Sequence, residues 1–137
     1  SIMQACLTPE LDPSVLVGQS TPTTESDENE ERGGIAWTDG VITTAVRKGK
    51  WMLLDNFSQG EASVLERLNP VLEHPAEWVL TEKGESDPVA IADGFRVVAT
   101  MTVTKEARSA SSTTSELSPA LYNRFTIINL SDLDMEQ

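Results

Sequence analysis

Trp51-Met52-Leu53-Leu54-Asp55-Asn56 is a short apolar run that ends in a carboxylate and an amide. A run of this length is typical of a buried strand in a parallel sheet. Because an ionised carboxylate is costly inside a core, Asp55 is expected at the exposed carboxyl end of that strand. In open α/β sheets this edge is where ligands bind. The stretch therefore predicts an α/β fold with a candidate site at Asp55.

The residues that precede this run predict a short helix that leads into it. Asp39 is a suitable N-cap and Gly49 a suitable C-cap, and the apolar residues between them lie on one helical face. Further upstream, residues 2–7 predict a strand, and we expect Pro9 and Pro13 to exclude regular structure soon after it.

The residues that follow the run predict five further elements. Residues 61–73 have an amphipathic helical pattern, with a kink or early stop expected at Pro70. Residues 78–91 predict a β-hairpin with its turn near Lys83-Gly84, and residues 95–101 predict a strand. Ser118 is expected to cap a helix with Pro119 in its first position, and residues 126–130 predict a last strand.

Composition restricts the class of protein. A chain of 137 residues is one domain at most, and no run approaches the 18 apolar residues of a membrane span. The N-terminus shows no basic region followed by an apolar stretch, so no secretory signal is indicated. The single cysteine, Cys6, cannot form an internal disulfide, which fits a reducing intracellular compartment.

The negative charge is concentrated near the N-terminus. The formal net charge is −12, which argues against direct contact with nucleic acid. Residues 1–34 hold seven acids and one base. We divide the chain into residues 1–18 (a strand and its connection), residues 19–34 (an acidic, mobile loop) and residues 35–137 (the core segment). The loop is either an insertion of variable length or an acidic docking or phosphorylation segment.

Several segments together resemble one family. Four apolar residues followed by Asp55 form a Walker B pattern, and VLERLN at 64–69, RVVATM at 96–101 and LSPALYNRF at 117–125 follow at characteristic spacing. In this order they resemble an AAA+ module of the midasin-like, dynein-related ATPases, from about residue 6 to residue 130. The resemblance implies a P-loop NTPase-like three-layer α/β sandwich, here incomplete, with a parallel sheet plus an inserted β-hairpin.

The same resemblance implies roles for four residues. Asp55 matches the residue that binds Mg²⁺ beside the nucleotide, and Asn56 stands where the catalytic Glu is usual. Thr102 occupies the sensor 1 position, and Arg124 matches the arginine finger that reaches the next module. Three of the four have an alternative interpretation. The alternatives are that Asp55 is a simple cap, that Asn56 marks a module that binds ATP without cleaving it, and that Arg124 is a surface ion-pair partner.

One essential part of the ATPase machinery has no match in the sequence. Gly49-Lys50 does not end a Walker A loop, because Trp51 replaces the required Ser or Thr and Thr44 replaces the first Gly. In the family, the strand before the P-loop lies centrally, between the strands that here end near Met101 and Leu130. We therefore expect a fragment or truncated product, with two unpaired sheet edges and an open core face. ATP and Mg²⁺ belong to the complete module, and we expect neither to bind this chain alone.

The resemblance also implies a biological role. Midasin-like proteins join six modules in one chain and use ATP to release assembly factors from precursors of the large ribosomal subunit in the nucleus. The implied partners are neighbouring modules and pre-ribosomal particles, with no membrane and no direct nucleic-acid contact. Two alternatives are a MoxR-like AAA+ chaperone module and a non-enzymatic interaction protein on a degenerate AAA+ scaffold.

Overall fold

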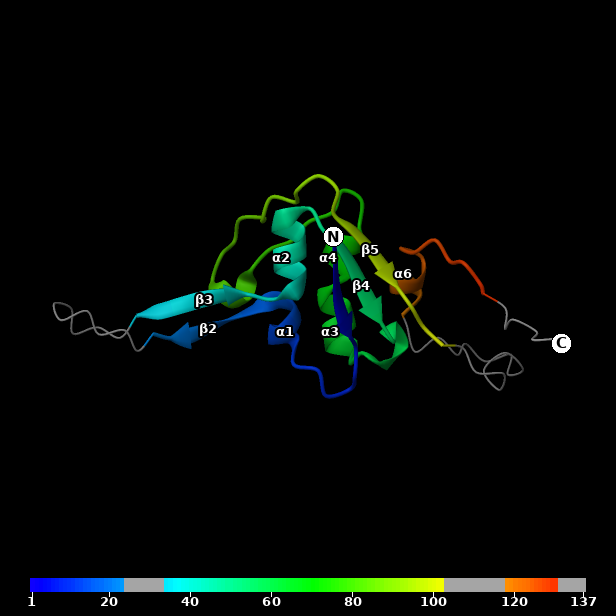
Figure 1. Ribbon diagram of the computed structural model, residues 1–137, viewed down its shortest axis with the longest axis horizontal. Helices are drawn as coiled ribbons and strands as arrows, with labels where there is room; N and C mark the ends of the chain where they lie inside the picture. The colour runs from blue at the N-terminus through cyan, green and yellow to red at the C-terminus, as the bar shows by residue number, and fades with distance from the viewer. Residues whose placement is uncertain (24–33, 103–117, 131–137) are drawn as a thin grey trace.

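Three parallel strands form the centre of the molecule (Figure 1). The computed structural model describes residues 1–23, 34–102 and 118–130. Strand β4 (Trp51–Asp55) lies between β1 (Ile2–Cys6) and β5 (Arg96–Ala99). The order β1-β4-β5, with parallel pairing on both sides of β4, confirms the predicted α/β class.

The register of the three strands sorts their side chains onto two faces. Met52 pairs with Met3 on one side and Val97 on the other, and this row faces the core. Trp51 belongs to the alternate rows and is 51% exposed, as Val98 is at 43%. Within the described residues, one face of the sheet is therefore covered and the other is open, as expected for an incomplete sandwich.

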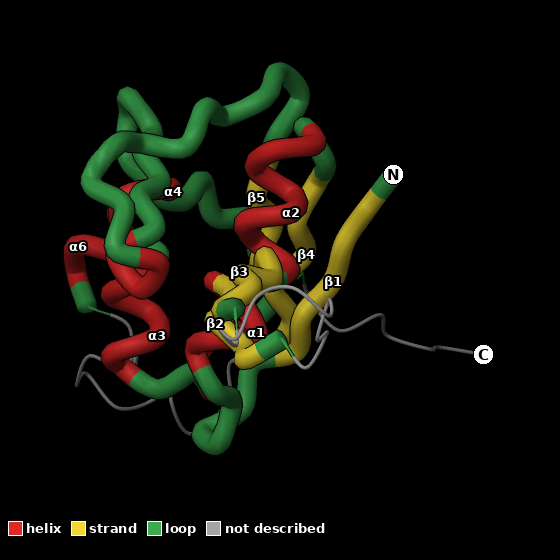
Figure 2. The backbone as a smooth tube through the Cα atoms, turned by 90° about the vertical axis from the view of Figure 1, so that its left-hand side faces the viewer, coloured by secondary structure: helices red, strands yellow, loops and turns green. Residues whose placement is uncertain are grey.

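The core lies between the covered face of the sheet and three helices. These are α2 (Val41–Lys48), α3 (Ala62–Arg67) and α4 (Asn69–Leu72). Figure 2 shows α3 and α4 grouped with α6 (Pro119–Tyr122) on the side of the molecule opposite β1. The largest fully buried side chains include Trp78, Phe57, Leu7, Leu16, Ile42, Met52 and Leu54. No helix of the described residues is long and apolar enough to cross a membrane.

The predicted amphipathic helix over 61–73 divides where proline was expected to interrupt it. Helix α3 ends at Arg67, Leu68 forms the junction, and α4 begins at Asn69 with Pro70 in its first turn. Proline is tolerated there because the first turn leaves its N–H groups without an intrahelical partner. The kink prediction is confirmed.

The prediction that prolines exclude structure after β1 is wrong for Pro13. This residue is the first position of helix α1 (Pro13–Val17). Asp12 is the N-cap, and its side chain accepts a 2.8 Å hydrogen bond from the Ser14 N–H. That hydrogen bond lowers the pKa of the Asp12 carboxyl.

A two-stranded antiparallel hairpin projects from the body, which the sequence did not predict (Figure 1). It consists of β2 (Gly18–Pro22) and β3 (Ile35–Asp39), so the loop expected from residue 19 begins later. Residues 24–33 lie outside the described part of the chain. In the sequence the hairpin lies between α1 and α2, and the two helix ends meet where the Gly40 N–H, at the start of α2, donates to the Val17 carbonyl at the end of α1 (3.0 Å).

Helix α2 is capped by Gly40 rather than by the predicted Asp39. A Cβ at residue 40 would lie 2.4 Å from the carbonyl carbon of Leu16, so only glycine fits this close approach of two helices. The Asp39 carboxylate instead accepts from the Trp37 indole (2.7 Å) and pairs with Arg47 (3.0 Å). Gly49 ends the helix in the left-handed conformation, as predicted.

Two predicted β elements are reduced or absent. The hairpin over 78–91 shrinks to a single bridge between Val79 and Pro88, because proline has no N–H to extend a ladder. Its turn is the 3₁₀ helix η2 (Thr81–Lys83). Residues 126–130 form no strand, since no described strand pairs with them, and Ile128 is 79% exposed.

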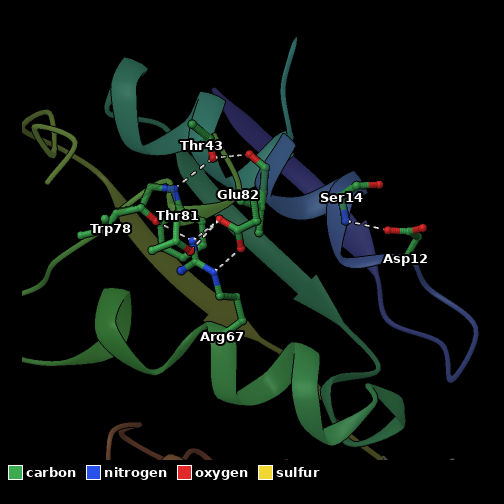
Figure 3. A network of polar contacts seen from close by, with 9 residues as sticks. Asp12, Ser14, Thr43, Arg67, Trp78, Thr81 and Glu82 are labelled. Carbon is green, nitrogen blue, oxygen red and sulfur yellow. Dashed lines mark hydrogen bonds and ion pairs between the residues drawn. The ribbon is translucent and has the colours of Figure 1, made fainter. Parts of the chain in front are cut away.

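A polar network holds the 78–82 segment against the core (Figure 3). The buried Trp78 indole donates to the Thr43 hydroxyl (3.0 Å), which in turn donates to the Val17 carbonyl (2.5 Å). The Arg67 guanidinium stacks 4.3 Å from the Trp78 ring centroid and makes two hydrogen bonds with Glu82. These bonds lower the pKa of the Glu82 carboxyl.

Candidate functional site

The candidate site lies at the carboxyl ends of the parallel strands, where the sequence placed it. Asp55 is the last residue of β4 and lies opposite Cys6, the last residue of β1. Both lie where their strands end, at the carboxyl edge of the sheet, and Asp55 is only partly exposed. Asn56 follows directly, and its amide donates a 3.4 Å hydrogen bond to the Cys6 sulfur. This edge therefore gathers a carboxylate, an amide and a thiol.

Thr100 completes the site, and the sequence analysis did not single it out. Its hydroxyl donates to the Asp55 carboxylate and accepts from the Asn56 backbone N–H (3.3 Å). The backbone of Thr100 extends the β4–β5 ladder, donating to Leu54 O (3.0 Å) and accepting from Phe57 N–H (2.8 Å). The residue is thus fixed by main-chain bonds on both sides, with its hydroxyl oriented at the carboxylate.

The strand register explains why Thr100 was missed. Leu54 pairs with Ala99, so the next residue on each strand places Thr100 beside Asp55. Aligning the apolar runs 51–54 and 96–99 in the sequence would have indicated this pair. Nothing local in the sequence gives the register, because it depends on two strands more than 40 residues apart.

The Asn56 backbone has an unusual conformation. Its φ is 54° and its ψ is 47°, which makes it the only non-glycine residue of the described chain with positive φ. Asparagine is among the few residues that adopt this left-handed region readily. The turn that carries the chain from β4 into η1 (Phe57–Gln59) therefore favours the asparagine found here over a residue such as glutamate.

The other two predicted site residues lie outside this hydrogen-bonded group. Thr102 is exposed, beyond the end of β5, and the hydroxyl beside Asp55 belongs to Thr100 instead. Arg124 follows α6, where its guanidinium pairs with Glu73 (2.5 Å) and donates to the Ala120 carbonyl (2.6 Å). The ion pair that the sequence analysis gave as an alternative is thus present, which leaves the finger role a prediction.

Helix α6 has the local structure that its sequence predicts. The Ser118 hydroxyl accepts from the Leu121 N–H (3.3 Å), and Pro119 occupies the first turn. Leu121 is buried, and Phe125 packs edge-on against Phe57, with ring centroids 5.3 Å apart. Leu121 and Phe125 therefore anchor the backbone on both sides of Arg124, and Phe125 does so against the residue that follows Asn56.

The side-chain oxygen atoms of Asp55 and Thr100 fit a partial magnesium site. A carboxylate and a hydroxyl are hard oxygen ligands, and Mg²⁺ takes one or two such groups together with water and phosphate oxygens. The described residues contain no cluster of three His, Cys, Asp or Glu side chains that could hold a metal by itself. Asp55 can thus contribute one ligand to a metal that a nucleotide also binds.

Comparison with known families gives a match along most of the chain. The model of the AAA domain, dynein-related subfamily, matches residues 7–125. The chain is 42% identical over 94 residues to midasin of Dictyostelium discoideum and 38% identical over 91 residues to midasin of Giardia intestinalis. These alignments cover 67% and 66% of this chain and 2% of each midasin.

Two further similarities extend over almost the whole chain. An uncharacterised protein of Staphylococcus saprophyticus is 28% identical over 125 residues, which is 91% of this chain and 43% of that protein. The crystal structure of a "putative ATPase" from Cytophaga hutchinsonii superposes with a TM-score of 0.56 at 18% identity. The superposition covers 96% of this chain and 34% of the other, and at this identity it supports the fold alone.

Proposed function

Because the chain belongs to the dynein-related subfamily of AAA domains, we propose that it supplies the magnesium-binding edge of a midasin-like ATPase module. The observation that carries this proposal is the Asp55–Thr100 pair at the carboxyl end of β4. Members of the family bind ATP and Mg²⁺ in the complete module. In that module, Asp55 would ligate the metal, and Thr100 would hold the carboxylate in one orientation.

Asn56, which follows the proposed metal ligand Asp55, supports a module that binds ATP better than it cleaves it. A carboxylate at position 56 would accept a proton from the attacking water, which an amide cannot do. Thr102 would contribute a hydrogen bond from the sensor 1 position. Arg124 would reach the γ-phosphate of a neighbouring module, because the anchors at Leu121 and Phe125 present it at the end of α6.

The similarity to midasins supports a role in a ring of AAA+ modules. We propose that the partners are neighbouring modules and that the ring remodels precursors of the large ribosomal subunit in the nucleus. The net charge of −12 supports contact through protein partners rather than RNA.

The first test replaces the proposed metal ligand in the full-length protein that contains this chain. Asp55→Ala should weaken Mg²⁺-dependent ATP binding by about tenfold or more, on the scale of altered metal sites. Asp87→Ala is the matched control, since it removes an exposed carboxylate far along the chain from β4. Equal affinities of the two variants would overturn the role of Asp55.

The second test concerns the biological role. Affinity purification of the tagged full-length protein should recover proteins of the large ribosomal subunit precursor, and more of them when ATP hydrolysis is blocked. Recovery that is independent of nucleotide and no higher than from a tag-only control would contradict the ribosome assembly role. It would leave the nucleotide chemistry intact and favour a different substrate.

A further inference from the structure

Arg124 is held inside its own chain by a single acid. Its Nη2 lies 2.5 Å from Glu73 Oε1, and its Nη1 donates to the Ala120 carbonyl at 2.6 Å. The Arg124 side chain is 25% exposed and that of Glu73 is 50% exposed. Glu73 is the residue that ends α4, so the pair joins two segments about 50 residues apart.

The Arg124 guanidinium is incompletely satisfied in this position. Its Nε is buried and has no hydrogen-bond partner among the described residues. A buried donor without a partner is unfavourable, and this offsets part of what the ion pair contributes. The side chain is therefore held in a position that does not use all of its donors.

Arg67 is a more extensively bonded arginine in the same chain. It donates through Nε (2.7 Å) and Nη2 (3.0 Å) to the two oxygens of Glu82, and through Nη2 to the Val79 carbonyl (2.5 Å). It also stacks on Trp78 (Figure 3). Arg124 has no described aromatic partner and only one carboxylate oxygen, so the two arginines are held to different degrees.

The local backbone allows the Arg124 side chain to turn while the main chain stays in place. Leu121 is 1% exposed, and Phe125 packs on Phe57. These two anchors fix the backbone before and after Arg124, so exchanging one carboxylate partner for another acceptor requires rotation of the side chain only.

We propose that Glu73 is a positioning residue that parks Arg124 within its own module, and that breaking this pair frees the guanidinium for a phosphate of the neighbouring module. This inference rests on the proposed finger role of Arg124. The trigger is competition, because a phosphate offers more acceptor oxygens than Glu73 and also reaches the unpaired Nε. Occupancy of the neighbouring site by ATP would thereby draw Arg124 from its parked position.

The parked position is tested directly on the 137-residue chain. Modification by phenylglyoxal, mapped by mass spectrometry, measures how free each guanidinium is. Glu73→Gln keeps the shape of the side chain and removes its charge, so Arg124 should react about two to five times faster, the range expected for loss of a partly exposed pair. Glu82→Gln is the matched control and should change the rate at Arg67 and leave that at Arg124 unaltered.

The thermal melting of both variants shows whether an altered rate reflects unfolding. If Glu73→Gln unfolds the chain, Glu73→Ala also removes the carboxylate and serves as the second variant. An unchanged rate at Arg124 in a folded Glu73 variant would overturn the parking role.

The full-length protein separates this inference from the proposed function beneath it. Glu73→Gln should raise kcat at the neighbouring site with little change in KM for ATP, and Arg124→Ala should lower kcat. Loss of turnover in Arg124→Ala with no effect of Glu73→Gln retains the finger and overturns the parking role. If Arg124→Ala leaves turnover unchanged, both the finger and the inference built on it are overturned.

Discussion

Asn56 illustrates how a backbone conformation and a chemical role compete at one residue. Its left-handed conformation lets the chain turn from β4 into η1, and its side-chain amide contacts Cys6 across the sheet edge. The proposed ATPase role calls for a water-activating carboxylate here, so the turn and that role favour different residues.

Replacement of Asn56 by glutamate should lower the stability of the isolated chain. Glutamate pays about 1 kcal/mol or more for the left-handed conformation, whereas glycine adopts it freely. We expect Asn56→Glu to shift the urea midpoint downward, and Asn56→Gly to leave it close to that of the original chain. If the two variants have the same urea midpoint, the backbone conformation of Asn56 does not determine the preference for asparagine over glutamate.

The same substitution should have the opposite effect on catalysis in the full-length protein. A carboxylate at this position restores a group that can activate water, a contribution of about 10²–10⁴ in rate. Asn56→Glu should therefore raise turnover at this module, measured with the neighbouring sites inactivated, and Asn56→Gln should not. High turnover with the original Asn56, unaltered by the glutamate, would mean that another residue is the base.

The Arg67–Glu82 pair makes stability depend on pH. Hydrogen bonds from Arg67 hold the pKa of the Glu82 carboxyl below its ordinary value of about 4.5. Since the folded state favours the ionised form, the contribution is fully present above that pH and is lost as pH falls through the lower folded-state pKa. The Glu82 side chain is 37% exposed, so screening limits the pair to about 0–1 kcal/mol.

Glu82→Gln should accordingly destabilise the chain at pH 7 and have little effect well below pH 4.5. Urea unfolding at a series of pH values measures the difference from the original chain. Glu66→Gln, which removes an exposed charge from α3, is the control. A destabilisation by Glu82→Gln that persists undiminished at low pH would show that something other than the charge of Glu82 accounts for it.

Elements with local signals were predictable, and those that depend on distant pairing were not. The cap at Gly49, the apolar face of α2 and the Ser118-Pro119 start of α6 are local, and each prediction is confirmed. The β2–β3 hairpin has mostly polar residues in β2 and lacks the alternation that marks a half-buried strand. The candidate site divides in the same way. Asp55 can be predicted from the sequence of its own strand, whereas Thr100 can be placed only once the register between β4 and β5 is known.

The projecting hairpin should be dispensable for folding of the body. Its outer residues are exposed, and its base is tied to α2 by the Asp39–Arg47 ion pair. Replacing residues 21–36 by Asn-Gly retains the Ser20–Trp37 pair and closes the hairpin with a two-residue turn. Stability should change by no more than about 0.5 kcal/mol, as for surface changes elsewhere, and a shorter loop costs less to close.

Urea unfolding measures the stability of the shortened chain. The comparison is Trp37→Ala in the chain that keeps the full hairpin. Trp37 packs against the core, so its loss should be the more destabilising of the two changes. A shortened chain that is less stable than the Trp37 variant would show that the outer hairpin supports the body.

At the scale of the whole molecule, the open face and the candidate site belong to the same three-stranded sheet. Trp51 and Val98 remain exposed on the face that the described helices leave uncovered, and Asp55 stands at the edge of the same sheet. The chain spans 2% of the length of each midasin that it resembles. Composition alone could not predict the open face, since 39% hydrophobic residues are enough for a modest core.

We therefore expect that the 137-residue chain does not bind ATP on its own in the micromolar range. Binding at 1 μM corresponds to about −8.2 kcal/mol, and in this class the backbone amides and lysine of the P-loop supply most of the phosphate contacts. The sequence contains no such loop, and the formal net charge of −12 repels the nucleotide. Calorimetric titration with ATP and Mg²⁺ should show no saturable heat, whereas the full-length protein should bind. Saturable micromolar binding that disappears on Mg²⁺ removal and in Asp55→Ala would contradict this expectation, because the sheet edge would then hold the nucleotide without a P-loop.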